Sequence, residues 1–219
     1  LLFALHGNGG EPDGFVNSLR EFIADDQFIG IYPEGHKTSW NLGREASTAN
    51  DTDFLENVAQ ALVENYTSMD HDRRYVIGFS NGAGMAHKLG IESSDFRAFV
   101  AVVTSLTTAN LPDSSSRHPA VMQVLGENDR LIPYEGGQGV AGHVFLSGDE
   151  SARTWAEHNG CNLTPKVTNF SDGSVKTTYN DCINSSDVVN YKVAGAGHQI
   201  PGNFEGGLLD LCWVFLSAH

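Results

Sequence analysis

The sequence predicts a single α/β domain in which helices cover both faces of a mainly parallel sheet. Short continuous runs of apolar residues, typical of strands buried on both sides, alternate along the chain with segments of helical periodicity. No internal repeat or linker interrupts this alternation. The length of 219 residues provides one full hydrophobic core and leaves little room for a second. Residues 1–219 are therefore expected to form one domain.

Six apolar runs are expected to form the parallel strands. In chain order they span residues 1–5, 28–32, 74–79, 99–103, 120–125 and 188–193. Pro33 ends the second run, because proline lacks the N–H group that a strand needs. Residues 34–50 are polar and predict a loop, and residues 166–180 are polar with a strand-like pattern that predicts a hairpin.

Segments with helical spacing of apolar residues lie between these runs. The first carries Phe15, Val16, Leu19, Phe22 and Ile23. Asp51 is expected to cap the second helix, and the third follows Ser80 with small residues that suit close packing on a sheet. Ser147 and Glu150 form a capping box before the fourth, and a last helix spans residues 208–216. Residues 104–119 are too few to hold a cap or lid domain.

The charge balance argues against several classes of partner. The chain has 13 Lys and Arg against 27 Asp and Glu, a formal net charge of −14. A body this acidic repels phosphate backbones, so no nucleic-acid partner is expected. No apolar run approaches the ~20 residues of a membrane span, so no membrane partner is expected either. Because the chain starts at Leu1 inside an apolar run, we expect a processed or truncated N-terminus.

The strongest local signal is Gly78-Phe79-Ser80-Asn81-Gly82, which matches G-x-S-x-G between an expected strand and an expected helix. That context is the one a nucleophile elbow requires. The Ser80 hydroxyl would be the nucleophile, and it needs a base to take its proton. A chance match is the alternative reading, because the motif is short, but the strand–turn–helix context favours the nucleophile.

His198 is the favoured base, because it lies in a glycine-rich loop directly after the last expected strand. This position also satisfies the chain order Ser, Asp or Glu, His. His143, in another glycine-rich loop, is the competitor, and His87 is expected to face solvent. An ordinary surface histidine is the remaining alternative for His198.

Asp129 is the favoured acid, because it follows the expected strand 120–125. Its carboxylate would fix the tautomer of the imidazole and stabilise the imidazolium as it forms. Glu127 is the rival, whereas Asp149 is better explained as a residue of the first turn of a helix.

The oxyanion of a tetrahedral intermediate needs main-chain N–H donors. One is expected from Asn81, the residue after the nucleophile, and the second from Asn8 in the turn His6-Gly7-Asn8-Gly9-Gly10. A phosphate cradle is the alternative for this turn. It is disfavoured because the turn lacks a G-K-[ST] ending and Pro12 falls where a dinucleotide motif needs glycine.

Together these segments resemble the poly(3-hydroxybutyrate) depolymerase-type and feruloyl-esterase-type carboxylesterases, which have the α/β-hydrolase fold. The matching segments are Leu5-His6-Gly7, Tyr32-Pro33-Glu34-Gly35, Ser39-Trp40-Asn41, Asp51 with Phe54-Leu55, 70–73 leading into 75–82, 126–129 followed by Ile132-Pro133-Tyr134, Asn159-Gly160-Cys161, and Gly197-His198 followed by Pro201-Gly202. The resemblance implies the triad Ser80, Asp129 and His198, and the oxyanion donors Asn8 and Asn81. It also implies a minimal or truncated sheet, since family members usually have strands before the first one here.

The chain departs from this family at two positions next to the expected site. Leu125 stands where the family commonly has His, and Ile200 stands where it commonly has Trp. Preference among esters therefore cannot be carried over from the family.

The three cysteines contain no C-x-x-C pair, which excludes a zinc ribbon, and by themselves they allow either one disulfide or three reduced thiols. The resemblance implies a disulfide between Cys161 and Cys182. Cys212 lies on the apolar face of the last expected helix and is expected to be a buried free thiol. A disulfide would indicate a secreted or periplasmic protein.

Two aromatic residues are candidates for substrate contact. Trp40 and Tyr134 lie in loops near the expected site, where an aromatic ring can stack on a substrate, and burial in the fold is the alternative for both. The sequence Asp51-Thr52-Asp53 resembles a metal pair, but helix capping explains it better. No metal or organic cofactor is expected.

The sequence thus predicts a serine carboxylesterase that works through an acyl-enzyme on Ser80. An open site would accept short acyl esters, and polyester or feruloyl esters as well. A thioesterase or serine peptidase with the same triad is the alternative enzyme, and a non-catalytic binding module is the alternative outside catalysis. The natural ester and the oligomeric state are not predicted.

Overall fold

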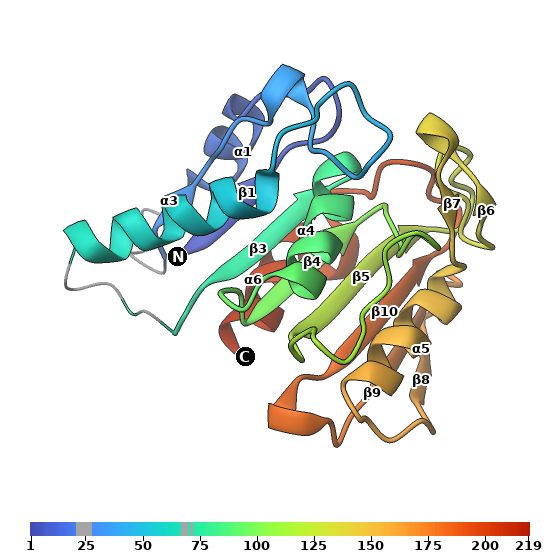
Figure 1. The fold of residues 1–219 in the computed structure, drawn as a ribbon. Coiled ribbons are helices and arrows are strands. Elements are labelled where there is room, and N and C mark those ends of the chain that lie inside the picture. The colour runs from blue at the N-terminus through green and yellow to red at the C-terminus, as the bar shows by residue number, and fades with distance from the viewer. Residues whose placement is uncertain (21–27, 67–69, 71) are drawn as a thin grey trace.

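A computed structural model describes residues 1–20, 28–66, 70 and 72–219. Within these residues the central sheet has eight strands in the order β2-β1-β3-β4-β5-β10-β9-β8 (Figure 1). The strands are β1 Leu2–Leu5, β2 Gly30–Ile31, β3 Tyr75–Phe79, β4 Ala98–Val102, β5 Ala120–Gly126, β8 Lys166–Asn169, β9 Val175–Tyr179 and β10 Val188–Val193. All pairs from β2 to β10 are parallel, and β10-β9 and β9-β8 are antiparallel. The mainly parallel sheet and the hairpin predicted over residues 166–180 are both confirmed.

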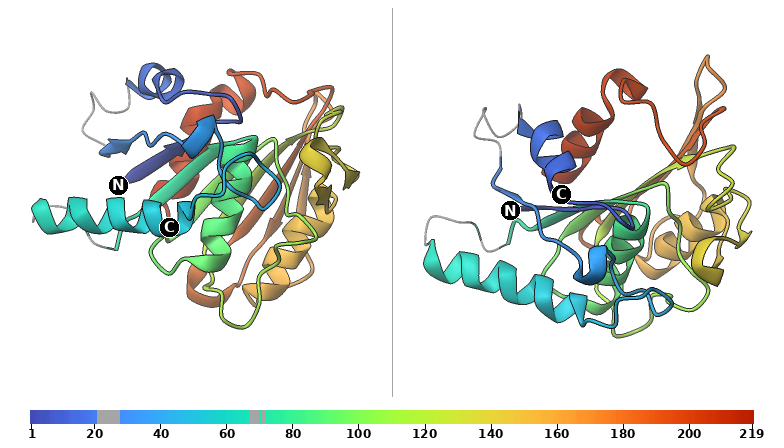
Figure 2. Two further views of the ribbon diagram at one scale, coloured as in Figure 1. Left: turned by 45° about the horizontal axis from the view of Figure 1, so that its top comes forward. Right: turned by 90° about the horizontal axis from the view of Figure 1, so that it is seen from above.

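Helices cover both faces of the sheet, as predicted (Figure 2). One face carries α3 Asp51–Asn65, α4 Asn81–Glu92 and α5 Gly148–His158, and the other carries α1 Asp13–Ser18 and α6 Leu208–Ser217. Each face has its own buried apolar cluster, because the sheet separates them: Trp155 packs in the first and Tyr191 in the second. A small antiparallel pair, β6 Gly137–Gln138 with β7 Val144–Phe145, lies after β5. Short 3₁₀ helices span His36–Thr38, Val140–Gly142, Ile183–Ser185 and Phe204–Gly206.

Two local predictions differ from the structure at their boundaries, and a third is tested only in part. The helix α3 is capped by Asn50, whose side chain accepts a hydrogen bond from the main-chain N–H of Asp53, so Asp51 is not its cap. The second strand is shorter than the apolar run that predicted it. The first helix is described over Asp13–Ser18 only, and Phe22 and Ile23 lie outside the described residues. The capping box of Ser147 and Glu150 is confirmed.

The carboxyl ends of the parallel strands meet at one edge of the sheet, where loops carry polar residues. The turn containing Asn8 follows β1, Ser80 follows β3, Asp129 follows β5 and His198 follows β10. In an open α/β sheet this edge is where ligands bind.

None of the helices in the described ranges is both long enough and apolar enough to cross a membrane.

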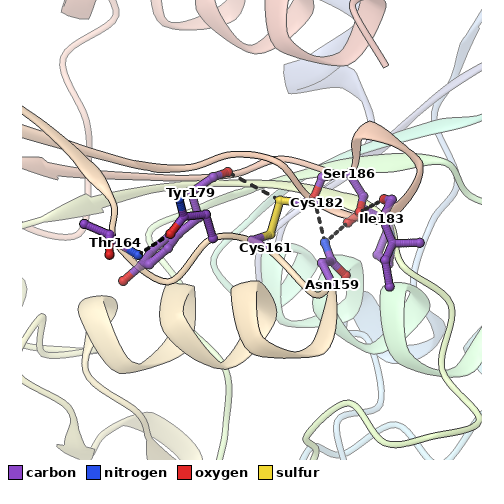
Figure 3. Close-up of a disulfide and its surroundings, with 9 residues drawn as sticks. Asn159, Cys161, Thr164, Tyr179, Cys182, Ile183 and Ser186 are labelled. Carbon is purple, nitrogen blue, oxygen red and sulfur yellow. Dashed lines mark hydrogen bonds between the residues drawn. A yellow bond between two sulfur atoms is a disulfide. The ribbon is translucent and has the colours of Figure 1, made fainter.

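A disulfide joins Cys161 to Cys182, as the family resemblance implied (Figure 3). It ties the turn after α5 to the segment after β9, across a sequence separation of 21 residues. The side chain of Asn159 lies beside it and donates hydrogen bonds to the carbonyl oxygens of Pro119 and Ser186, at 2.7 and 2.8 Å. Cys212 is a buried free thiol on α6.

Removal of this disulfide in the variant Cys161→Ala/Cys182→Ala should lower the free energy of unfolding by roughly 3 kcal/mol, because the unfolded chain gains loop entropy. Urea unfolding followed by circular dichroism measures the difference. The single variant Cys212→Ala should lose stability when a reductant is added, whereas the double variant should be insensitive to it. Equal sensitivity of both variants to the reductant would contradict the prediction.

Candidate active site

Ser80 lies on a strained turn between β3 and α4. Its backbone has φ 54° and ψ −120°, a conformation that residues with a side chain seldom adopt. The flanking glycines allow this turn: a Cβ on Gly78 would collide with the carbonyl of Gly82, and a Cβ on Gly82 would collide with that of Leu5. The main-chain N–H of Ser80 donates to the carbonyl of Val102 at 3.0 Å, which ties the turn to β4.

The loops after β3, β5 and β10 bring three predicted residues into contact. The hydroxyl oxygen of Ser80 lies 2.7 Å from Nε2 of His198, and Nδ1 of His198 lies 2.7 Å from Oδ2 of Asp129. Because the carboxylate only accepts, Nδ1 carries the ring proton and Nε2 accepts from the hydroxyl. Ser80, His198 and Asp129 thus form a continuous hydrogen-bonded relay between residues far apart in the chain.

Asp129 is buried, and it is held as a carboxylate. Burial alone would raise its pKa, but hydrogen bonds from the His198 ring and from the main-chain N–H groups of Ile132 and Leu131 outweigh this and lower the pKa. The two N–H groups bind Oδ1 at 3.0 and 2.8 Å, so Oδ2 is left to face His198. An ionised, immobilised carboxylate suits the stabilisation of an imidazolium.

Glu127, the rival acid, has a different contact. Its carboxylate accepts from the main-chain N–H of Gly195 at 3.1 Å and lies 3.4 Å from the ammonium of Lys192. The main-chain N–H of Asn128 donates to the carbonyl of Ala196 at 2.7 Å. These bonds hold the loop that carries His198 against the end of β5.

The two predicted oxyanion donors lie on either side of the nucleophile in the chain. Neither the main-chain N–H of Asn8 nor that of Asn81 donates a hydrogen bond among the described residues. Asn81 is the first residue of α4, where N–H groups are unpaired and the helix dipole favours negative charge. The loop of Asn8 is close by, since a Cβ on Gly7 would lie 3.4 Å from Cβ of Ser80. Two free donors therefore flank Ser80.

His87 is not at the surface, and the prediction that it faces solvent is wrong. It is 2% exposed: its Nδ1 accepts from the indole N–H of Trp155 at 3.1 Å, and its Nε2 lies 3.2 Å from the carbonyl oxygen of Thr104. The small residues of α4 bring the helix close to the sheet, so position 87 falls on its buried face. Burial lowers the pKa of His87 to about 4 and keeps the ring neutral.

His143, the competing base, is paired elsewhere. Its Nε2 lies 2.8 Å from Oε1 of Glu45, and both side chains are buried. Glu45 also accepts from the main-chain N–H groups of Leu42 and Arg44. The pair thus joins the loop around residue 44 to the segment between β6 and β7.

Trp40 and Tyr134 are both buried, which favours the structural alternative for each. Trp40 is 0% exposed, so its ring offers no face to a substrate in this structure. The hydroxyl of Tyr134 donates to Asp149 at 2.8 Å and accepts from the side-chain amide of Asn190 at 3.0 Å. Burial, reinforced by the Asp149 carboxylate, raises the pKa of Tyr134. Asp149 lies in the first turn of α5, as predicted, and it also binds the buried hydroxyl of Tyr134.

Asp51, of the sequence that resembles a metal pair, accepts a hydrogen bond from the main-chain N–H of Asn41 at 2.6 Å. Among the residues that the structure describes, no group of three or more His, Cys, Asp or Glu side chains is placed to hold a metal ion.

Sequence reasoning missed the polar contacts behind the relay. The hydroxyl of Thr104 donates to the carbonyl of Ser80 at 2.7 Å, and the side chain of Asn81 bonds the main chain of Trp40. No periodicity or motif marks Thr104, and the motif that contains Asn81 says nothing about its side chain. Trp40 belongs to a segment of the family pattern, but the sequence singled it out as a substrate contact and not as a partner of Asn81.

A large cleft of about 1060 Å³ lies elsewhere, at the amino ends of the strands. Its lining mixes Arg74, Arg97 and Arg117 with Asp95 and several serines, and it contains none of the relay residues. It is therefore separate from the candidate active site.

Comparisons with known proteins agree with this architecture, although no family model matches the chain. The chain is 27% identical to a protein named "Probable feruloyl esterase C" from Aspergillus clavatus, over 100% of this chain and 77% of the relative. It is 31% identical to NocK of Nocardia uniformis, described by its name as an esterase, over 62% of this chain but only 42% of that relative.

The solved structures show the fold. The acetyl xylan esterase from Aspergillus awamori superposes with a TM-score of 0.67 at 17% identity, over 98% of this chain and 88% of that one. The Bacillus cereus carboxylesterase superposes with a TM-score of 0.54 at 15% identity, over 100% of this chain and 87% of that one. The chain has the α/β-hydrolase fold. The resemblance to esterases inferred from the motifs is confirmed by these relatives.

The buried, neutral His87 should make this α/β-hydrolase less stable in acid. The unfolded ring takes up a proton below pH ~6.5, whereas the folded ring resists protonation down to about 4, so stability falls as the pH drops between these values. The free energy of unfolding should be about 2 kcal/mol lower at pH 5 than at pH 7 on this account.

Urea unfolding of His87→Gln, whose amide can replace both ring contacts, should lack most of this difference between pH 7 and pH 5. The control His36→Gln changes an exposed histidine and should keep the full difference in stability between pH 7 and pH 5. An unchanged pH dependence in His87→Gln would contradict the assignment.

Proposed function

We propose that the protein is a serine carboxylesterase that hydrolyses carboxylic esters through an acyl-enzyme on Ser80, with residues 1–219 as a single catalytic domain. The observation that carries the proposal is the hydrogen-bonded relay from Ser80 through His198 to Asp129, at the carboxyl edge of an α/β-hydrolase sheet. Relatives named feruloyl esterase and esterase support an ester hydrolase in particular.

In the acylation step, Oγ of Ser80 bonds to the carbonyl carbon of the ester while its proton passes to Nε2 of His198. The N–H groups of Asn8 and Asn81 bind the oxyanion that forms. The bond from carbon to the alkoxy oxygen then breaks, and the imidazolium gives its proton to the departing oxygen.

Deacylation repeats these steps with water as the nucleophile. Water loses a proton to Nε2 of His198 as its oxygen bonds to the acyl carbon, and collapse of the intermediate returns that proton to Ser80 and releases the acid. Asp129 stays ionised throughout and stabilises each imidazolium.

Short acyl esters are the proposed basic substrates, and feruloyl or polyester groups are the candidates for larger ones. The names of the relatives, feruloyl esterase and acetyl xylan esterase, support this range without ranking it. The net charge of −14 favours neutral esters and helps to repel the acid product. The Cys161–Cys182 disulfide supports export to a secreted or periplasmic location, where such bonds persist.

Replacement of the nucleophile, Ser80→Ala, should reduce hydrolysis of p-nitrophenyl acetate by roughly 10⁴-fold or more. A fluorophosphonate probe should label the parent protein at Ser80, located by peptide mass spectrometry, and should not label the variant. Normal hydrolysis by Ser80→Ala would overturn the proposed function. A panel of acetyl, feruloyl, polyester and thioester substrates then separates esterase from thioesterase.

The assignment of the acid predicts a contrast between two neighbouring substitutions. Asp129→Asn should lower kcat by roughly 10⁴-fold, because an amide favours the wrong tautomer of His198. Glu127→Gln should lower kcat by less than about tenfold, since Glu127 only supports the loop. Steady-state kinetics measures both, and a larger loss in Glu127→Gln would reverse the assignment.

A further inference from the structure

Trp40 contacts both halves of the proposed oxyanion hole, although its ring is fully buried. Its main-chain N–H donates to Oδ1 of Asn81 at 2.7 Å, and Nδ2 of Asn81 donates to the carbonyl of Trp40 at 2.9 Å. The side-chain amide of Asn81 is thus paired twice with one residue, and this pairing fixes the first residue of α4.

The indole of Trp40 reaches the other half. Its N–H donates to the carbonyl of His6 at 2.9 Å, and the two rings lie 5.2 Å apart. His6 is two residues before Asn8 and is itself immobilised, since its Nε2 accepts from the main-chain N–H of Gly35 at 2.9 Å. The loop that carries Asn8 is therefore anchored through Trp40.

We propose that Trp40 is a positioning residue for the oxyanion hole, and that the three residues Trp40, Asn81 and His6, here called the Trp40 brace, set the separation of the Asn8 and Asn81 N–H groups. The inference rests on the proposed function. It assigns the Asn81 side chain a role distinct from that of its main-chain N–H.

The physical reason is that an oxyanion hole acts only if its donors are aimed before charge develops. The two donors come from different elements, the β1 loop and the start of α4, so no local hydrogen bond sets the distance between them. A rigid indole has few rotatable bonds and is held in place here by buried packing. Trp40 can therefore fix the separation of the Asn8 and Asn81 N–H groups, because its own ring moves little.

The variant Trp40→Phe keeps a buried aromatic ring but removes the N–H donor to His6 together with part of the indole volume, a loss of volume that the control below shares. We expect kcat for p-nitrophenyl acetate to fall roughly tenfold with little change in KM, because the donors act on the transition state. The affinity for phenylboronic acid, which forms a tetrahedral adduct on Ser80, should fall by a similar factor.

Trp155→Phe is the matched control. Trp155 is also 0% exposed and also donates its indole N–H to one buried acceptor, Nδ1 of His87. We expect it to lose stability in thermal unfolding, with kcat and boronate affinity unchanged. Asn81→Ala, which keeps its main-chain N–H, should lower kcat like Trp40→Phe, and the double variant should lose less than the product of the two factors.

Several results would overturn the brace. One is a rise in KM with unchanged kcat in Trp40→Phe, which would make Trp40 a substrate contact. Another is an equal loss of kcat in Trp40→Phe and Trp155→Phe, which would mean that kcat falls only because the fold is less stable. Should Trp40→Phe fail to fold, an unchanged kcat in Asn81→Ala would overturn the proposal by itself. Failure of the proposed function is distinct, because then Ser80→Ala would remain active.

Discussion

The left-handed backbone at Ser80 is the constraint on which the rest of the carboxyl edge depends. It turns the chain from β3 into α4 within one residue, so the hydroxyl projects above the sheet and the helix begins at once. Such a conformation is costly and persists only where its surroundings enforce it. Here the enforcement comes from both neighbouring strands: Val102 on β4 and Thr104 just after it bond the main chain of Ser80, and Gly82 packs on the end of β1.

A second strained residue supports the first. Val103, directly after β4, also has a positive φ of 55°, which is unusual for a β-branched residue. Its main-chain N–H donates to the carbonyl of Val124 on β5, so the chain bends while it stays attached to the sheet. The bend brings the Thr104 hydroxyl to the carbonyl of Ser80 at 2.7 Å. The strained backbone at Val103 thus places the Thr104 hydroxyl where its hydrogen bond stabilises the strained conformation of Ser80.

The sequence predicts the fold and the relay because both depend on local order along the chain. Ser80 has a motif, and Asp129 and His198 each follow an apolar run, so strand ends alone place them at one edge. The orientation of His87 and the burial of Trp40 depend on how closely a helix or loop approaches the sheet. That distance is set by glycines and small side chains on several segments at once, and no single window of sequence contains it. The prediction of the α3 cap was wrong for a related reason. Asn50 and Asp51 are both good capping residues, and the backbone conformation decides which of them caps the helix.

Sheet order separates the two chemical tasks of the proposed site. The nucleophile strand β3 pairs with β1 on one side, and β1 leads into the loop of Asn8. On the other side β4 intervenes before β5 and β10, which lead to Asp129 and His198. In the proposed mechanism, proton transfer is therefore organised from one side of Ser80 and oxyanion binding from the other. Among the described residues, the two networks meet at the Ser80 turn and the start of α4. Because their supports are separate, a change in the Glu127 and Gly195 contacts should act on the base, whereas a change at Trp40 should act on the oxyanion. The short turn from Ser80 to Gly82 is where both meet, and there is no room in it for a Cβ at position 82, which would collide with the carbonyl of Leu5.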